Sequence, residues 1–200
     1  FDLFLVDRLE KFSLLRSKSV FAQGTHLHKD AQECLHEACV TLAHTPRSNM
    51  NLGIGRTPVE GFHCPVMLGT DGFGEDVLAE ARGAWLRARD SQAALYPEKV
   101  VGMLATGARY ASDLLSREIG TLRPGAEADL LVTSYRPAVP LGAENLASHL
   151  LFSLGPEFIR HVMVQGKWLM RDHVIESCDE EKIRSDSVSV ARRLWERMEK

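Results

Sequence analysis

LAHTPRSNM (residues 42–50) and VMLGTDG (residues 66–72) are two segments in which a short apolar run ends in polar residues. The second run leads to the carboxylate of Asp71. In a barrel of alternating strands and helices, side chains with chemical roles follow the carboxyl ends of the strands. The two segments therefore predict neighbouring strands, with Ser48 and Asn49 in a loop over residues 46–55 at the same mouth as Asp71.

The chain has 200 residues, ordinary apolar and charged fractions and a net charge of −3, which predict a soluble globular protein. This charge gives no reason to expect a nucleic acid or an anionic membrane as a partner. No apolar run reaches the length of a membrane span, and the first residues do not resemble a signal peptide. The chain starts at Phe1 and not at a methionine, so we interpret it as a piece of a longer protein.

The cysteines show no Cys-x-x-Cys pair and no zinc-finger spacing. They are Cys34, Cys39, Cys64 and Cys178. This pattern predicts free thiols in a reducing compartment, and hence a cytoplasmic location.

Strand-like and helix-like segments alternate over residues 1–115. Strands are predicted at 19–23, 39–43 and 65–68, and helices at 2–15, 29–38, 76–90 and 97–115, with a short helical turn near 58–61. Such alternation favours parallel strands joined by helical crossovers. A full (β/α)8 barrel usually takes roughly 250 residues, so this part corresponds to about three of its strands.

Residues 116–178 have a mostly β composition. Strands are predicted from Ile119 onward and over 128–133, and a hairpin is predicted over 161–170. The capping box Ser177-x-x-Glu180 predicts the start of a last helix. We therefore divide the chain into a barrel part (1–115), a small β-sandwich-like domain (116–178) and a helix (179–200) that packs on the rest. The predicted buried face of this helix consists of Ile183, Ala191, Leu194, Trp195 and Met198.

Asp71 follows the strand predicted at 65–68 and is flanked by Gly69 and Gly72. A carboxylate in this position can bind a divalent metal and accept a proton from the water that the metal activates. The alternative is a turn or helix cap, which is a common role of aspartate in glycine-rich loops. Local spacing alone does not choose between the two roles.

Further polar candidates lie near the same strand ends. Ser48 and Asn49 suit either a polar substrate or hydrogen bonds within their own loop. His26 and His28 alternate as metal-sharing strand residues do, but a Gly-Thr pair precedes them, so we expect the chain to have left the strand there. We place His28 on the solvent side of a helix start and leave the role of His26 open. His44 ends a strand and is either a site residue or a packed one.

Several motifs occur in a fixed order along nearly the whole chain. They are Arg8-Leu9, Leu14-Leu15, residues 44–50, Leu68-Gly69-Thr70-Asp71-Gly72, residues 123–130, Glu144-Asn145-Leu146 and Leu194-Trp195. Together they resemble the C-terminal half of the amidohydrolase superfamily. The similarity is strongest to the branch of guanine, cytosine and S-adenosylhomocysteine deaminases and chlorotriazine hydrolases, and within it to the SsnA-type aminohydrolases.

The resemblance implies an α/β fold, namely strands six to eight of a partial (β/α)8 metal-dependent hydrolase barrel, a small β-rich domain and a C-terminal helix. It implies one divalent metal, zinc or iron, with Asp71 as a ligand and general base. The implied substrate is a small nitrogen heterocycle, such as a purine, pyrimidine or triazine, in which a C–N bond is hydrolysed. Asp71 would take a proton from the attacking water and pass it toward the departing ammonia. Ser48, Asn49 and His26 are then the substrate-binding candidates.

Two departures from the family pattern bear on activity. The metal-binding His-x-His of strand one and His-x-x-Glu of strand five would precede Phe1, and a catalytic zinc normally has three protein ligands. We therefore expect this chain alone to be inactive and not to retain the metal, and we expect its partner to be the missing N-terminal half of the barrel. At the position of the strand-six histidine stands Gln23, which can donate a hydrogen bond to an oxyanion but cannot carry a proton.

Two functions are consistent with these residues. The first is a fragment of a metal-dependent aminohydrolase in which Asp71 and Gln23 are the catalytic residues. The alternative is a catalytically degenerate relative that keeps the barrel for binding or assembly. Gln23 favours the degenerate relative, whereas Asp71, Ser48 and Asn49 favour the enzyme. The sequence leaves open the heterocycle and whether the chain forms a homo-oligomer.

Overall fold

The computed structural model describes residues 5–199, so positions 2–4 of the predicted first helix lie outside the described residues. The chain divides into two compact units, which are described separately. The first unit contains the residues up to Ala126 together with Arg136–Pro156. The second unit contains Glu127–Tyr135 and the residues from Glu157 onward.

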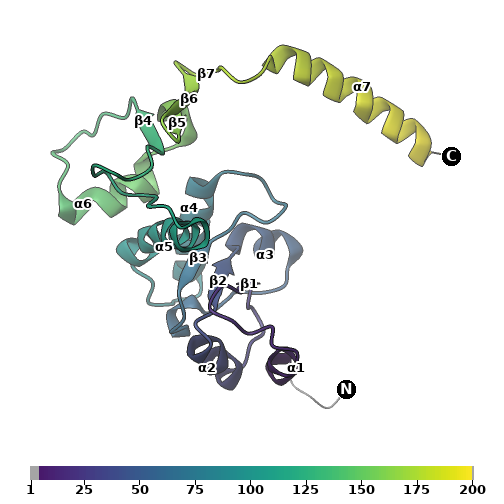
Figure 1. Ribbon diagram of the computed structural model, residues 1–200, viewed down its shortest axis with the longest axis vertical. Coiled ribbons are helices and arrows are strands. Elements are labelled where there is room, and N and C mark those ends of the chain that lie inside the picture. Colours follow the sequence, from purple (N-terminus) through teal and green to yellow (C-terminus); the bar gives the residue numbers. More distant parts are fainter. Residues whose placement is uncertain (1–4, 200) are drawn as a thin grey trace. The chain divides into compact units, whose positions relative to one another are not determined.

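The first unit is built on a parallel sheet of three short strands (Figure 1). The strands β1 (Val20–Ala22), β2 (Thr41–His44) and β3 (Val66–Leu68) lie in the order β1-β2-β3, and both neighbouring pairs are parallel. β2 is therefore the central strand, with a partner on each side. The predicted alternation of parallel strands and helical crossovers is confirmed in this unit.

Helices and helical turns precede, connect and follow these strands. They are α1 (Leu5–Lys11), α2 (Lys29–Glu37), α3 (Pro46–Leu52), a 3₁₀ turn (Val59–Gly61), α4 (Val77–Asp90), α5 (Pro97–Leu115), α6 (Ala143–Ser148) and a π-helical turn (His149–Ser153). α5 has the bounds that the sequence predicts. Pro97 takes the first helical position, where a missing N–H costs nothing, and the apolar stripe of the helix includes the buried Val100 and Met103.

The core of this unit combines side chains from α2, β2, the 3₁₀ turn, α4 and α5. Leu35, Leu42 and Val100 are fully buried in it, and Val59 is nearly so. Burial of an apolar side chain of this size contributes about 1.5–3 kcal/mol. This packing fixes the helices on the sheet, and it therefore fixes where the polar residues at the strand ends lie.

The prediction of a loop over residues 46–55 is wrong, because residues 46–52 form the helix α3. Pro46 begins the helix, and Gly53 ends it in the left-handed conformation with a φ of 64°, which is a common helix end. Isolated helices of about this length are not stable in water. Tertiary contacts supply the difference, since the backbone N–H of Arg47 donates to Glu80 Oε1 on α4 at 2.8 Å.

Two more segments differ from the predictions. The first helix ends earlier than predicted, at Lys11, and Ser13 after it has a φ of 54°. The segment 116–129 contains no strand. There, the N–H of Ile119 donates to Ser112 Oγ at 2.9 Å, and the same hydroxyl donates to the carbonyl of Ile119 at 3.3 Å. These bonds occupy the groups that a strand would offer to a neighbouring strand.

Residues 143–153 are helical and belong to the first unit. Leu151 is 1 % exposed and lies in its core. On α4, Arg82 Nε donates to the carbonyl of Leu151 at 3.0 Å, and the Trp85 ring meets Phe152 edge to face. The observed division of the chain therefore differs from the predicted one, in which residues 116–178 form one β-rich domain. The reason is that apolar residues within 143–153 pack against α4.

The second unit contains an antiparallel sheet in the order β4-β5-β6-β7. Its strands are β4 (Leu130–Thr133), β5 (Ile159–Val164), β6 (Lys167–Arg171) and β7 (Val174–Ile175), with a 3₁₀ turn (Pro156–Phe158) before β5. Gln165 and Gly166 connect β5 to β6 with φ values of 50° and 75°. Two successive positive φ values suit the twist of a tight hairpin. The hairpin predicted over residues 161–170 is confirmed.

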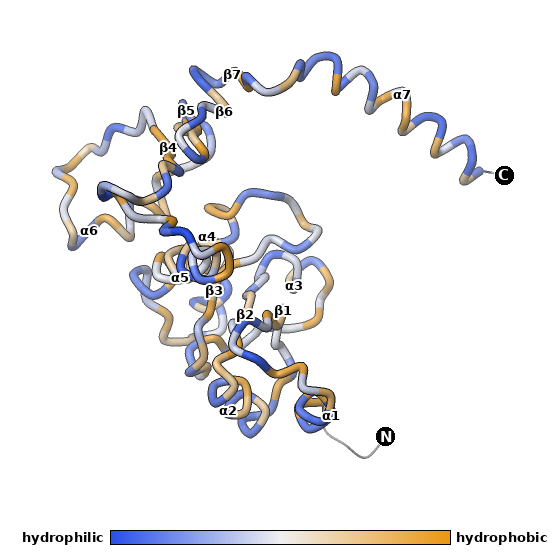
Figure 2. Tube along the Cα trace, in the orientation of Figure 1, coloured by the Kyte–Doolittle hydropathy of each residue, from blue (hydrophilic) through white to orange (hydrophobic). Residues whose placement is uncertain are grey.

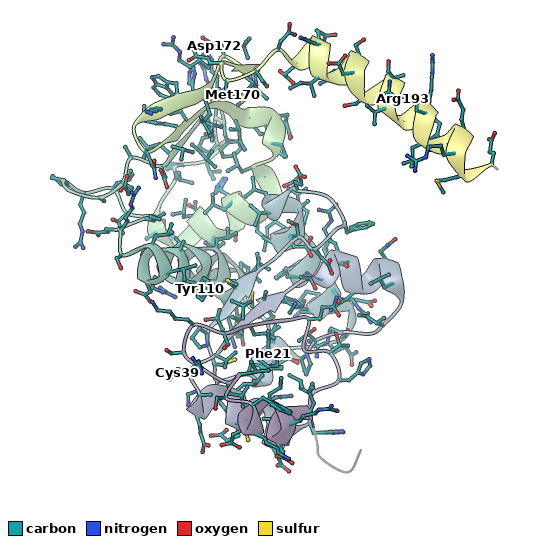
Figure 3. All side chains as sticks on the ribbon, turned by 45° about the vertical axis from the view of Figure 1, so that its right-hand side comes forward. Phe21, Cys39, Tyr110, Met170, Asp172 and Arg193 are labelled. Atoms are coloured by element: carbon teal, nitrogen blue, oxygen red, sulfur yellow. The ribbon has the colours of Figure 1, made fainter. Side chains whose placement is uncertain are left out.

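The last helix, α7 (Glu180–Met198), differs from its prediction in two ways. Its N-cap is Asp179, whose carboxylate accepts the N–H of Lys182 at 3.0 Å, so the predicted capping box is wrong. No residue of α7 is buried, and Trp195 is 61 % exposed, so the predicted packing of its apolar face is also wrong. Figure 2 shows apolar positions recurring along this helix, and Figure 3 shows its side chains, among them Arg193.

Two simpler predictions concern the whole described chain. All four cysteines are free, as predicted. Burial raises the pKa of the Cys64 thiol, which makes this cysteine a poor nucleophile. Among residues 5–199, no helix combines the length and apolar character that crossing a lipid bilayer requires.

We expect Leu35→Ala to lower the free energy of unfolding by about 2–5 kcal/mol, the usual cost of the cavity that a buried leucine leaves. The matched control is Leu86→Ala on α4, where the leucine is 53 % exposed and the change should stay within about 0.5 kcal/mol. Urea denaturation followed by circular dichroism measures both values. Equal losses in the two variants would contradict the assignment of the core.

Candidate active site

Polar residues that follow the three parallel strands meet at the carboxyl ends of these strands. Gln23 follows β1, Ser48 lies on α3 after β2, and Asp71 follows β3. Asp71 Oδ2 accepts hydrogen bonds from Gln23 Nε2 (3.1 Å) and from Ser48 Oγ (2.9 Å). The structure thus brings together three predicted site residues that are far apart in the sequence.

The carboxylate of Asp71 is exposed and oriented by these bonds. Its backbone has a φ of 53°, and Oδ1 accepts the N–H of Gly72 at 2.7 Å. The bonds from Gly72, Ser48 and Gln23 lower the pKa of Asp71, because each of them is made to the charged form. Asp71 is therefore an ionised carboxylate at neutral pH, with both oxygens held by the protein.

The backbone at the end of β1 determines where the side chain of Gln23 lies. The N–H of Gln23 donates to the carbonyl of Ala43 at 2.9 Å, which extends the pairing of β1 and β2 by one residue. Gln23 and Gly24 then turn the chain with φ values of 70° and 64°. A Cβ at Gly24 would lie 2.9 Å from Leu42 Cδ1, so this close approach requires glycine.

Asn49 lies behind this site and is 1 % exposed. Its Nδ2 donates to Thr25 Oγ1 (3.1 Å) and to Thr57 Oγ1 (3.3 Å). Thr57 Oγ1 in turn donates to the carbonyl of Gln23 at 2.6 Å. This buried network ties α3 to the segment after β1 and holds Asn49 in the interior. The predicted contact of Asn49 with a substrate stays a prediction. Nothing in the sequence distinguishes the two threonines from other loop threonines.

The histidines occupy three different environments. His28 is exposed directly before α2, as predicted. His26 is also exposed and lines a cavity of about 710 Å³ between α1 and α2. His44 is 3 % exposed, and burial and the charge of Arg56 lower its pKa to about 4. His44 is therefore a neutral, packed histidine at neutral pH.

Asp71 is the residue of this site that fits a divalent metal, because a carboxylate oxygen is a suitable ligand. Within residues 5–199, no group of three or more His, Cys, Asp and Glu side chains is arranged to hold a metal ion.

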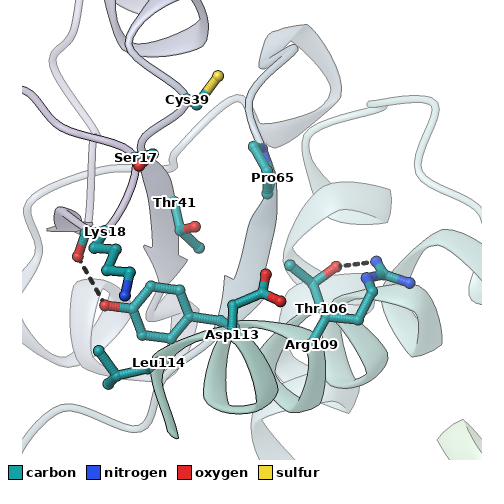
Figure 4. A pocket seen from close by; sticks show the side chains of 10 residues that line it. Ser17, Lys18, Cys39, Thr41, Pro65, Thr106, Arg109, Asp113 and Leu114 are labelled. Atoms are coloured by element: carbon teal, nitrogen blue, oxygen red, sulfur yellow. Dashed lines mark hydrogen bonds between the residues drawn. The ribbon is translucent and has the colours of Figure 1, made fainter. Parts of the chain in front are cut away.

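A separate cavity of about 290 Å³ lies at the opposite edge of the sheet (Figure 4). Lys18 precedes β1, Thr41 begins β2 and Pro65 precedes β3, so the cavity is at the amino ends of the strands. Tyr110 on α5 also lines the cavity, and its hydroxyl donates to the carbonyl of Lys18 at 2.9 Å. None of the predicted site residues lines this cavity.

Comparison with known proteins identifies the family. The model of the amidohydrolase family matches residues 2–169. The chain belongs to the amidohydrolase family. The membership that the motifs predicted is thereby confirmed.

The relatives of this amidohydrolase chain include deaminases. The 5-methylthioadenosine/S-adenosylhomocysteine deaminase of Haloarcula marismortui is 32% identical over 199 residues, which cover 94% of this chain and 45% of that protein. The deaminase of the same name from Pelotomaculum thermopropionicum is 32% identical over 186 residues, or 88% of this chain and 42% of that protein. The amidohydrolase chain thus spans less than half the length of these curated relatives.

Solved structures match the fold of the amidohydrolase chain. An adenosine deaminase from Xanthomonas campestris with bound zinc has a TM-score of 0.82 and 21% identity, over 94% of this chain and 45% of that chain. Atrazine chlorohydrolase TrzN from Arthrobacter aurescens, in complex with zinc, has a TM-score of 0.74 and 20% identity, over 90% of this chain and 42% of that chain. At such low identity the likeness concerns the fold alone, and it confirms the predicted α/β amidohydrolase class.

We expect Ser48→Ala to raise the pKa of Asp71, because one hydrogen bond to the charged form is lost. A lowered pKa stabilises the fold above the ordinary pKa of the carboxyl, and this contribution is lost as the pH falls through the lowered value. In the variant the folded-state pKa lies closer to the ordinary value, so the contribution should be smaller and should be completely lost at a higher pH than in the wild type. A ¹³C NMR titration of the side-chain carboxyl measures the change. The pKa of Asp172, which Arg160 lowers, is the control and should not move; an unchanged Asp71 would contradict the bond.

Proposed function

We propose that this amidohydrolase chain is the C-terminal part of a metal-dependent aminohydrolase that hydrolyses a C–N bond of a nitrogen heterocycle. In this proposal β1, β2 and β3 are strands six, seven and eight of a (β/α)8 barrel, and the antiparallel sheet belongs to the small β-rich domain. Three observations support it: the parallel order β1-β2-β3, the family match over residues 2–169 and the deaminase relatives. The missing N-terminal half of the barrel would complete the site.

The observation that carries the proposal is the geometry around Asp71. Gln23 and Ser48 both donate to Oδ2, and Gly72 donates to Oδ1, so the carboxylate is ionised and fixed at the ends of the strands. A turn cap needs only the bond from Gly72. The two side-chain bonds come from residues that follow β1 and β2, so segments after three strands together fix the orientation of the carboxylate.

Asp71 would serve as a metal ligand and as the general base. When bound, a divalent metal, zinc or iron, lowers the pKa of its water to about 7. Asp71 would take a proton from the attacking water and deliver it to the departing ammonia. A positioned carboxylate contributes about 10²–10⁴-fold to such proton transfers. The other ligands would come from the missing half of the barrel.

The remaining predicted residues support this carboxylate in different ways. Gln23 cannot act as an acid or a base, because its amide does not titrate. Its N–H group orients Asp71 and can donate to an oxygen of the substrate. Ser48 and His26 remain candidates for contact with the substrate. Asn49 holds Gln23 and α3 in place through its buried network.

We expect Asp71→Asn to abolish ammonia release by the complete product of the gene that encodes this chain. The amide keeps the size of the side chain but cannot accept the proton, so the rate should fall by at least about 10²–10⁴-fold. Adenosine, 5-methylthioadenosine and S-adenosylhomocysteine are the first substrates to test, because they appear in the names of the relatives. The matched control is Asp113→Asn, an exposed aspartate at the amino edge of the sheet. Turnover of the Asp71 variant close to wild type would rule out the assigned role.

The alternative hypothesis, a catalytically degenerate relative, predicts a different result for the same protein. It would bind a heterocycle or a second chain without releasing ammonia from purines, pyrimidines or triazines. Gln23 is the residue that favours this alternative, because it replaces an ionisable side chain with a neutral one. Turnover by the wild type separates the two cases, and Gln23→His then tests the role of the glutamine. If the protein is an enzyme tuned by glutamine, wild type turns over and the variant changes in rate or substrate preference; a degenerate protein is inactive before the change.

A further inference from the structure

The carboxylate of Glu80 on α4 is buried, and only one of its two oxygens accepts a hydrogen bond from the described residues. The residue is 0 % exposed. Its Oε1 accepts the backbone N–H of Arg47 (2.8 Å), while Oε2 lies 3.7 Å from Arg47 Nη1 and accepts no hydrogen bond in the described structure. Burial of a charged group is costly unless it is paired. This glutamate therefore requires a reason beyond packing.

The side chain of Arg47 connects this carboxylate to the segment that follows Asp71. Arg47 Nη1 donates to the carbonyl of Asp76 at 3.3 Å. Its guanidinium lies 5.2 Å from the centre of the Phe73 ring, a cation–π distance. One arginine thus contacts α4 and both ends of the segment 73–76.

Gly83 makes room for this arrangement. A Cβ at Gly83 would lie 2.8 Å from Arg47 Cγ and 3.5 Å from Cδ. Glycine in the interior of a helix costs about 1 kcal/mol relative to alanine. Here that cost allows the stem of Arg47 to pass directly over α4 beside Glu80. Glu80 and Gly83 are one helical turn apart, so both lie on the face of α4 that meets α3.

We infer that Glu80 is a positioning residue for the Asp71 site and acts through Arg47. Glu80 Oε1 accepts the backbone N–H of Arg47, and this bond fixes the first turn of α3. The same turn carries Ser48, whose hydroxyl donates to Asp71 Oδ2. The charge of Glu80 holds the guanidinium, which fixes the segment directly after Asp71. The donor and the acceptor of the Ser48–Asp71 hydrogen bond are thereby positioned by one buried carboxylate. This inference rests on the proposed function, in which Asp71 accepts a proton.

The test uses Glu80→Gln in the complete gene product. Glutamine keeps the size of the side chain and the oxygen that accepts the Arg47 N–H, but it removes the charge that holds the guanidinium. We expect the variant to fold and to contain as much metal as wild type, with kcat for ammonia release lowered by about tenfold and KM changed by less than about twofold. Glu98→Gln, which changes an exposed glutamate on α5, should leave both constants unchanged.

A second variant keeps the inference open to refutation if Glu80→Gln folds poorly. Arg47→Met retains the backbone N–H and an apolar stem and removes the charge. Its kcat should fall by a similar factor, and the double variant should lose less than the product of the two, because both changes break one interaction. A lower melting temperature with unchanged kcat per folded, metal-loaded molecule would make Glu80 a merely structural residue and would overturn the inference.

Hydrogen exchange separates a failure of this inference from a failure of the proposed function. In Glu80→Gln, the amides of residues 45–53 and 70–76 should exchange faster together, while those of α2 keep the wild-type rate. If wild type releases no ammonia but both segments respond together, the proposed function fails and the positioning role of Glu80 stands. If the two segments do not respond together, the inference fails whatever the activity.

Discussion

The carboxyl ends of three parallel strands converge on one aspartate, and the candidate site depends on this convergence. Parallel pairing places the residues after β1, β2 and β3 at the same edge of the sheet. Backbone bonds continue the ladder past the strands, from Gln23 to Ala43 and from Gly69 to His44. Only after these bonds do the segments turn, which is why Gln23 and Ser48 reach Asp71 within hydrogen-bond distance.

A buried polar layer supports the site, in addition to the hydrophobic core that packs the helices on the sheet. Asn49, Thr25 and Thr57 satisfy one another and hold the carbonyl of Gln23. Glu80 holds the beginning of α3 from the other side. Each of these groups loses its bonds to water on burial, so the arrangement is stable only if all partners are present at once. Such a network specifies a single geometry for the exposed carboxylate in front of it.

The two units differ in how they are stabilised. The first unit has a continuous core around Leu35, Leu42 and Val100. The second contains a four-stranded meander and α7, and no residue of α7 is buried. An apolar stripe predicts an amphipathic helix, and α7 is such a helix. The spacing of the apolar residues does not predict which surface this apolar face packs against.

Hydrophobic periodicity and turn residues in the sequence determined the three strands, the helices α2, α4 and α5, the β5–β6 hairpin and the order that makes the sheet parallel. The motifs determined the family and pointed to Asp71. Short-range patterns could carry these features because each depends on neighbours a few residues apart. Tertiary structure alone decided that residues 46–52 form a helix, since Glu80 is 33 positions from the N–H that it accepts. It also decided that Asn49 is buried while Ser48 reaches Asp71, because neighbours on a helix face different directions and only packing selects which of them faces the site.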